Sequence, residues 1–280
     1  MGSLKTRSIS GLVFLVAMIA AMWLPWTYIV IFAVAILIMT IEYFNITIGR
    51  SYLLEKIFSI IGCVSVFLLI FFSMGVSLIS ERYILLAFFP VIATCIALLY
   101  ESKTMSPQEQ NKSIHLFFPY IYIALPMAAT VFLAFKDEGI FNSTLLLSVF
   151  LMIWLNDVGA YIFGMSFGQN QDSRKLFPSI SPKKSWVGFW GGTFVSIAVS
   201  LILWDVGFLD FYIQYCVAIA IIVSVFGVYG DLFESLIKRH YGVKDAGKIM
   251  PGHGGLLDRF DGALFAVPAV AIFLKLIGLI

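Results

Sequence analysis

The strongest constraint on this chain is a succession of long apolar stretches that leaves little room for charge. Of its 280 residues, 61% are hydrophobic and only 12% are charged, whereas a soluble domain usually carries about 25% charged residues. A soluble fold has no place to hide this much apolar surface, so the lipid bilayer must serve as the solvent for most of it. We therefore predict an all-α polytopic membrane protein.

The lengths of the apolar runs predict about nine transmembrane helices. Only Pro25 and Trp26 separate the first two segments, which should therefore form a tight hairpin. The candidate segments are 9–24, 27–44, 57–78, 83–100, 117–135, 143–163, 188–204, 212–229 and 263–280.

The distribution of Lys and Arg predicts the orientation of these helices. With the N-terminus placed in the cytoplasm and the sides alternating, only Arg82 and Lys136 fall outside, and Lys275 lies within the last segment. The remaining basic residues fall on the cytoplasmic side, as the positive-inside rule requires. Because nine is an odd number, we expect the C-terminus to lie outside the cytoplasm.

The chain then divides into two regions. Residues 1–140 hold about five N-terminal transmembrane helices, and residues 141–280 form a C-terminal transmembrane region with long cytoplasmic loops at 164–187 and 230–262. Polar loops on one face are where a membrane enzyme meets a water-soluble substrate. We therefore expect catalysis in the C-terminal region, and we expect Glu42, near the inner end of the second segment, to be structural or interfacial.

Three aspartates in the last third of the chain predict a cation site. Asp258 and Asp261 are three residues apart, so on a helix they share one face. Two like charges at the membrane boundary repel and are costly to desolvate. Mg²⁺ removes both penalties, because it typically binds through one or two carboxylates plus substrate phosphates. Asp231 is a third candidate ligand, and a solvated loop with surface acids is the alternative for all three.

Basic residues surround the same acids and could neutralise phosphate groups. They are Lys238, Arg239, Lys244, Lys248 and Arg259. The alternative is topological, because cytoplasmic loops are basic in any case and bind anionic lipid surfaces. For Lys244 and Lys248 both interpretations stay open, whereas the position of Arg259 between two acids favours an ion pair or a functional role.

A glycine-rich turn from Pro251 to Gly255 surrounds a histidine with permissive backbone. Gly254 and Gly255 let main-chain N–H groups approach phosphate oxygens closely. His253 could donate a hydrogen bond to a phosphate or transfer a proton. The pattern is weak by itself, and the glycine patterns of dinucleotide-binding folds and P-loops are absent from the sequence.

Two further polar patches adjoin apolar segments. Ser181, Lys183 and Lys184 precede the seventh segment, and lysines and hydroxyls at a helix start favour phosphate binding. An ordinary basic flank is the alternative. Asn156 and Asp157 lie within the sixth segment, where an ionisable residue indicates function by default and a helix–helix hydrogen bond is the alternative.

Together these motifs resemble the signature of the phosphatidate cytidylyltransferases, also called CDP-diacylglycerol synthases. The resemblance covers about residues 150–268, and it includes Asn156-Asp157 and the segment 181–188. Met250 stands where the family more usually has Ile, Leu or Phe. The longest matching run reads Ser235-x2-Lys238-Arg239-x4-Lys244-Asp245-x-Gly247-x3-Pro251-x-His253-Gly254-Gly255-x2-Asp258-Arg259-x-Asp261.

The resemblance implies the reaction CTP + phosphatidate → CDP-diacylglycerol + pyrophosphate, a step of phospholipid biosynthesis. It also implies Mg²⁺ dependence, a homodimer and the inner membrane of a bacterium, while a second cation such as K⁺ stays open. No nucleic-acid partner is expected. The predicted catalytic residues are Asp231, Asp258, Asp261, Arg259 and His253, of which the three aspartates are the predicted metal ligands. The predicted substrate-binding residues are Asn156, Asp157, Ser181, Lys183, Lys184, Ser235, Lys238, Arg239, Lys244, Gly254 and Gly255.

Two other functions stay open from the sequence. Intramembrane Asp157 and about nine spans also permit a transporter or channel. A related lipid kinase would use CTP but transfer its γ-phosphate instead of the cytidylyl group. A CDP-alcohol phosphotransferase is not favoured, because its Asp-Gly-x2-Ala-Arg motif with paired downstream aspartates is absent from the sequence.

Overall fold

The computed structural model describes residues 4–49, 51–75, 80–101, 112–136, 139–169 and 174–280. The end of the third predicted segment (76–78) and part of the first predicted loop (170–173) lie outside these residues. The chain forms two compact units, each described below by itself. Unit 1 comprises Met1–Phe141 and Asp245–Arg259, and unit 2 comprises Asn142–Lys244 and Phe260–Ile280.

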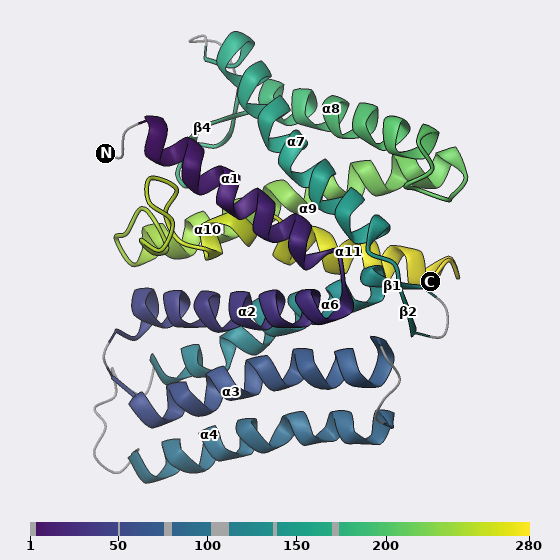
Figure 1. Ribbon diagram of the computed structural model, residues 1–280. Coiled ribbons are helices and arrows are strands. Elements are labelled where there is room, and N and C mark those ends of the chain that lie inside the picture. The colour runs from purple at the N-terminus through teal and green to yellow at the C-terminus, as the bar shows by residue number, and fades with distance from the viewer. Residues whose placement is uncertain (1–3, 50, 76–79, 102–111, 137–138, 170–173) are drawn as a thin grey trace. The chain divides into compact units, whose positions relative to one another are not determined.

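Unit 1 is built from helices that pack side by side. Helices α2, α3 and α4 follow one another through the unit, and α6 also packs on α3 (Figure 1). A two-strand hairpin pairs Phe135 with Phe141. The elements are α1 (Leu4–Ala21), α2 (Pro25–Thr47), α3 (Leu53–Ile70), η1 (Phe71–Gly75), η2 (Glu81–Ala87), α4 (Phe88–Glu101), η3 (Ser113–Leu116), η4 (Tyr120–Ala124), α6 (Leu125–Ala134), β1 (Phe135–Lys136) and β2 (Ile140–Phe141).

Aromatic side chains fill the centre of unit 1. Tyr28 and Phe32 of α2 pack against Phe67 of α3 with ring centroids 5.8 and 6.4 Å away, respectively. Pro25 stands at the first position of α2, where a missing N–H costs no helical hydrogen bond. Helices α1 and α2 pack on each other across a three-residue connection at 22–24, so the predicted hairpin turn lies just before Pro25, which begins α2.

Unit 2 is a helical bundle with one short hairpin. Helix α7 packs on α8, and α9 packs on both α8 and α11 (Figure 1). The hairpin pairs Lys175 with Ser185, and the Ser185 hydroxyl caps α8 by accepting the Gly188 N–H at 3.2 Å. The elements are α7 (Thr144–Phe167), β3 (Lys175–Phe177), β4 (Ser181–Ser185), α8 (Trp186–Asp205), α9 (Ile213–His240) and α11 (Ala263–Leu276). The remaining short helix, α10 (Leu257–Phe260), contains the boundary between the units.

Glycines let α7 and α8 approach each other closely. A Cβ atom on Gly192 would lie 2.8 Å from the main-chain oxygen of Asn156, and one on Gly159 would lie 2.7 Å from the Val195 side chain. Small residues at such crossings allow helices in lipid to gain close van der Waals contact. The packing against α7 therefore explains the adjacent glycines Gly191 and Gly192, since a Cβ atom on Gly191 would also lie only 2.3 Å from the Phe163 side chain.

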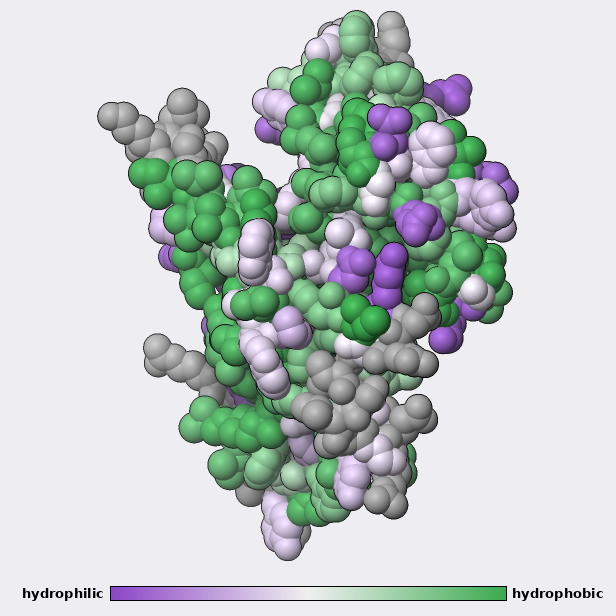
Figure 2. Space-filling model, turned by 45° about the vertical axis from the view of Figure 1, so that its right-hand side comes forward, coloured by the Kyte–Doolittle hydropathy of each residue, from purple (hydrophilic) through white to green (hydrophobic). Residues whose placement is uncertain are grey.

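The helices have the lengths and surfaces of a multi-pass membrane protein. Large hydrophobic side chains such as Trp23, Phe194 and Leu276 are exposed, and hydrophobic residues cover most of the face seen in Figure 2. Six helices of the described residues are long and apolar enough to cross a bilayer. They are Pro25–Thr47, Leu53–Met74, Ser113–Ala134, Thr144–Phe167, Trp186–Asp205 and Ile213–His240.

The other three predicted segments are also helical, but they are shorter. They are Ile9–Ala21, Leu85–Tyr100 and Ala263–Leu276. The six long helices establish a multi-pass membrane protein, whereas the count of nine spans and the sides of the termini stay predictions.

Two local expectations from the sequence were wrong. The predicted loop 230–262 is helical as far as His240, because α9 continues beyond its apolar part. It ends in a Schellman motif, in which Gly242 (φ 68°) donates to the Arg239 carbonyl and Val243 donates to the Lys238 carbonyl. In addition, Asp258 and Asp261 do not share one helix, since α10 ends at Phe260 and Asp261 lies in the following turn.

Candidate functional site

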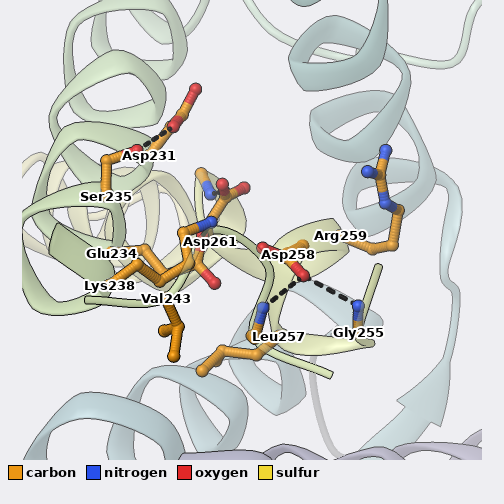
Figure 3. A network of polar contacts seen from close by, with 12 residues as sticks. Asp231, Glu234, Ser235, Lys238, Val243, Gly255, Leu257, Asp258, Arg259 and Asp261 are labelled. Atoms are coloured by element: carbon orange, nitrogen blue, oxygen red, sulfur yellow. Dashed lines mark hydrogen bonds and ion pairs between the residues drawn. The ribbon is translucent and has the colours of Figure 1, made fainter. Parts of the chain in front are cut away.

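One face of α9 carries two acids, a hydroxyl and a lysine. Asp231, Glu234, Ser235 and Lys238 follow the i, i+3, i+4, i+7 spacing that places side chains on one side of a helix (Figure 3). The Ser235 hydroxyl donates to Asp231 Oδ1 at 3.2 Å. Lys238 Nζ lies 2.7 Å from Glu234 Oε2, and both side chains are buried.

Close backbone packing brings a further carboxylate to this face. A Cβ atom on Gly230 would lie only 2.3 Å from the main-chain oxygen of Asp261, so only glycine allows α9 to approach the turn before α11. The Asp261 carboxylate accepts the Gly262 N–H at 2.6 Å. Burial, followed by the charge of neighbouring carboxylates, raises the pKa of Asp261 well above its ordinary value. Those neighbours are Asp231, Glu234 and Asp157.

We call Asp157, Asp231, Glu234 and Asp261 the acidic cluster. Lys184 of β4 lies 2.6 Å from Asp231 Oδ2, so the hairpin brings a second lysine to the cluster. Four carboxylates thus face two ion-paired lysines, Lys184 and Lys238.

This donor set fits Mg²⁺, because hard carboxylate oxygens carry negative charge that the two lysines only partly offset. Within the described residues, no three His, Cys, Asp or Glu side chains are already arranged as a metal cage. Substrate phosphates would have to supply the remaining ligands.

A second group of predicted residues lies in unit 1. It comprises residues 245–256, which we call the signature loop, and Asp258 and Arg259 of α10. Asp258 Oδ2 accepts the Gly255 N–H at 2.7 Å (Figure 3). The same oxygen accepts the Ala246 N–H at 2.8 Å. Gly254 has a φ of 84°, and a Cβ atom there would lie 2.5 Å from Asp258 Oδ2. One oxygen of Asp258 therefore fastens the loop, and the glycine makes room for it.

Arg259 closes the same loop from its other side. Its Nη2 donates to the His253 carbonyl at 2.9 Å, and the Met250 N–H donates to the Gly254 carbonyl at 3.0 Å. Among the described residues, the buried Nε of Arg259 has no hydrogen-bond partner. The structure thus gives Arg259 a hydrogen bond to the signature loop. The ion pair or functional role predicted for it stays a prediction.

The remaining predicted residues are more scattered. Lys183, Arg239 and Lys244 are exposed, and Arg239 Nη1 donates to the Val243 carbonyl at 3.1 Å. Ser181 begins β4 opposite Phe177. Asn156 is buried, and its Oδ1 has no hydrogen-bond partner within the part of the chain that the structure describes. The sequence predictions for these residues stay predictions.

Three residues near these groups were given no catalytic or substrate-binding role from the sequence: Glu234, Glu42 and Ser10. Glu234 could have been found, because it stands three residues after Asp231 and four before Lys238. That spacing is informative only once α9 is known to continue past residue 229. Glu42 and Ser10 carry no such signal, because their partners lie more than 200 residues away.

Comparison with known protein families shows to which family the chain belongs. A model of the cytidylyltransferase family matches residues 5–277. The chain belongs to the cytidylyltransferase family. The family resemblance predicted from the sequence motifs is thereby confirmed, and the match includes both the acidic cluster and the signature loop.

Individual members of the cytidylyltransferase family are similar over a shorter range. The phosphatidate cytidylyltransferase of Staphylococcus epidermidis is 46% identical over 139 residues, which are 50% of this chain and 51% of the relative. That of Staphylococcus saprophyticus is 48% identical over 141 residues, and that of Staphylococcus aureus strain COL is 45% identical over 141 residues; each alignment covers 50% of this chain and 51% of the relative. The chain thus spans about half the length of the curated relatives it matches.

Proposed function

We propose that this protein transfers a cytidylyl group from CTP to phosphatidate, forming CDP-diacylglycerol and releasing pyrophosphate. The observation that carries the proposal is the acidic cluster with its two lysines, in a multi-pass member of the cytidylyltransferase family. The names of the relatives supply the lipid substrate. The bilayer is where such a substrate resides.

In the proposed reaction, a phosphate oxygen of phosphatidate attacks the α-phosphorus of CTP. A new P–O bond forms there as the bond from the α-phosphorus to the oxygen bridging to the β-phosphorus breaks, and pyrophosphate leaves with that electron pair. Both reactants are anions, so positioning and charge neutralisation decide the barrier. No general base is required, because the attacking phosphate is already ionised near neutral pH.

The residues of this chain would divide that work. Asp231 and Asp261 would hold Mg²⁺, and Asp258 stays a predicted third ligand. When bound, Mg²⁺ supplies positive charge to phosphate oxygens. Lys183 and Lys184 of the β3–β4 hairpin would neutralise phosphate groups, and the second cation stays open.

Lys238, Arg239 and Arg259 were also predicted to bind phosphates. Lys238 already neutralises Glu234, so we assign it first to the cluster and only then to a substrate. His253 keeps the catalytic role predicted from the sequence, and Ser235 and Lys244 keep the predicted substrate-binding roles.

The proposal includes the membrane arrangement. Nine spans with a cytoplasmic N-terminus would place the β3–β4 hairpin and the end of α9 on the cytoplasmic side, where CTP is found. We also propose a homodimer and the bacterial cell membrane as the location, in keeping with the bacterial relatives.

The test is an assay of the purified full chain in phosphatidate-containing mixed micelles, with CTP labelled separately at the α- and γ-phosphates. We expect α-label in the lipid product, γ-label in pyrophosphate, and loss of turnover with EDTA that Mg²⁺ restores. Lipid labelled at the γ-phosphate would instead identify a lipid kinase. Solute flux in vesicles without any CTP turnover would identify a transporter.

A further inference from the structure

Glu42 of α2 is a buried carboxylate that holds the signature loop by two hydrogen bonds. Its Oε1 accepts the Leu256 N–H at 3.1 Å, and its Oε2 accepts the Leu257 N–H at 2.8 Å. Glu42 is only 6% exposed, so both oxygens replace lost water with main-chain donors. Burying a carboxylate costs free energy unless it is hydrogen-bonded. Packing alone therefore does not account for a glutamate at this position.

Two glycines of the signature loop leave the space that this carboxylate occupies. A Cβ atom on Gly247 would lie 2.2 Å from Glu42 Oε1, and one on Gly255 would lie 2.6 Å from the same oxygen. Neither glycine has a positive φ, so their backbone conformation does not require glycine. The space occupied by Glu42 does.

A second side chain from the start of the chain holds the same loop. The Ser10 hydroxyl of α1 donates to the Pro251 carbonyl at 3.0 Å, and its oxygen lies 2.6 Å from His253 Nδ1. Because the hydroxyl hydrogen is used for Pro251, the oxygen accepts a hydrogen from Nδ1. Helices α1 and α2 thus both fasten the loop that carries His253.

We infer that Glu42 is a positioning residue for the proposed cytidylyl transfer. Its two acceptors fix the main chain at the junction between the signature loop and Asp258, whose Oδ2 in turn fastens Gly255 and Ala246. Glu42 thereby sets the direction of Asp258 and Arg259 without touching a substrate. The inference rests on the proposed function for its catalytic consequence, but the anchoring of the loop can be measured independently.

The test replaces Glu42 by Gln and follows both the loop and the reaction. Gln offers one acceptor oxygen, so one of the two N–H groups loses its partner. We expect hydrogen–deuterium exchange in peptides covering 246–260 to become faster and kcat to fall at least about tenfold, with KM for CTP changed less than threefold and an unchanged elution profile. Glu55→Gln is the matched control, because Glu55 is a buried glutamate on α3 that no described hydrogen bond joins to the loop; it should change neither readout.

A second variant keeps the charge and covers the case in which Glu42→Gln fails to fold. Gly247→Ala places a methyl group 2.2 Å from Glu42 Oε1, too close for both to stay in place. We expect the same faster exchange and the same fall in kcat. Wild-type kcat in either folded variant, or an equal fall in Glu55→Gln, would overturn the inference. If wild-type protein does not turn over CTP, the proposed function fails instead, and the exchange data still decide whether Glu42 anchors the loop.

Discussion

Asp261 is placed where its charge is unfavourable unless a cation is near. Burial and three neighbouring carboxylates raise its pKa, so ionisation weakens the folded state. The unfolded chain releases this proton at lower pH than the folded one, and stability therefore falls as pH rises from the ordinary aspartate pKa toward the raised one. A group held in this way is suited to binding a cation and poorly suited to stabilising the fold.

Asp261→Asn should therefore separate activity from stability. We expect CTP turnover to fall at least about 100-fold, which is the usual loss for one preorganised electrostatic group. Without divalent cations, the variant should melt at a higher temperature than wild type at pH 7, and the difference should shrink toward pH 4. Kinetics and thermal melting in EDTA measure both effects. Asp210→Asn, at an exposed aspartate between α8 and α9, should change neither, and wild-type turnover in Asp261→Asn contradicts the metal proposal.

The pair Lys238–Glu234 makes a different prediction, because both side chains are buried at 2.7 Å. Lys238→Met alone should cost about 3 kcal/mol of stability, since it leaves a buried carboxylate without its partner. Adding Glu234→Gln should recover most of that loss. A double-mutant cycle of thermal unfolding measures the coupling, with Lys248→Met at an exposed lysine as the control. Purely additive effects would show that the two groups do not interact.

For single residues, the sequence allowed the charged residues of the site to be predicted, but not the hydrogen bonds that hold them. Asp231 and Asp261 were singled out because acids beside apolar segments are costly unless a cation is near, and Lys184 because lysines and hydroxyls at a helix start favour phosphate binding. The hydrogen bonds of Glu42 and Ser10 were not predictable, because their partners lie 214 and 243 residues away. Nor could a motif reveal that Asp258 Oδ2 is used by two main-chain N–H groups.

Among the elements, α7 and α8 depend on glycine at their contact. Gly192→Ala should destabilise the protein by about 1–3 kcal/mol, because the new methyl group meets the main-chain oxygen of Asn156 at 2.8 Å, and backbone cannot move cheaply. Gly227→Ala on α9 is the matched control, since a Cβ atom there has open space and alanine is the better helix former. Melting temperatures in lipid nanodiscs compare the two. A larger loss in Gly227→Ala would contradict this account of the packing.

The element boundaries show where apolar run length is informative. All nine predicted segments contain helix, because an apolar run of this length must satisfy its backbone internally in lipid. Helix α9 extends beyond its predicted segment, because its last turns are polar. There the helix continues through Asp231, Ser235 and Lys238, and its end is set by Gly242, a turn signal that lies within a run otherwise interpreted as loop. The hairpin β3–β4 was also not predicted, because its residues do not alternate between apolar and polar.

For the whole molecule, cysteine labelling in cells can test on which side of the membrane Lys136 and Lys183 lie. In a variant with Cys63, Cys95 and Cys216 replaced by Ala, Lys136→Cys should react with a membrane-impermeant maleimide in intact cells. Lys183→Cys, also at an exposed position, should react only after permeabilisation, since the spanning helix α7 lies between them. Labelling of both from outside would mean that α7 does not cross, and the reverse pattern would invert the predicted orientation.

The C-terminus decides whether nine spans is the right count. Helix α11 has 14 residues, which at 1.5 Å per residue is about 21 Å, shorter than the roughly 30 Å hydrocarbon core. Residues 277–280 are apolar, but they form a turn that caps α11, in which Gly278 has a φ of 71° and the Leu279 N–H donates to the Leu274 carbonyl. A crossing by this short helix therefore requires local thinning of the bilayer. With nine spans, alkaline phosphatase fused after Ile280 should be active and a green fluorescent protein fusion dark. The same pair of fusions placed after His240, at the end of α9, should give the opposite result. A fluorescent fusion at Ile280 would mean that α11 enters the membrane and returns, leaving an even number of crossings.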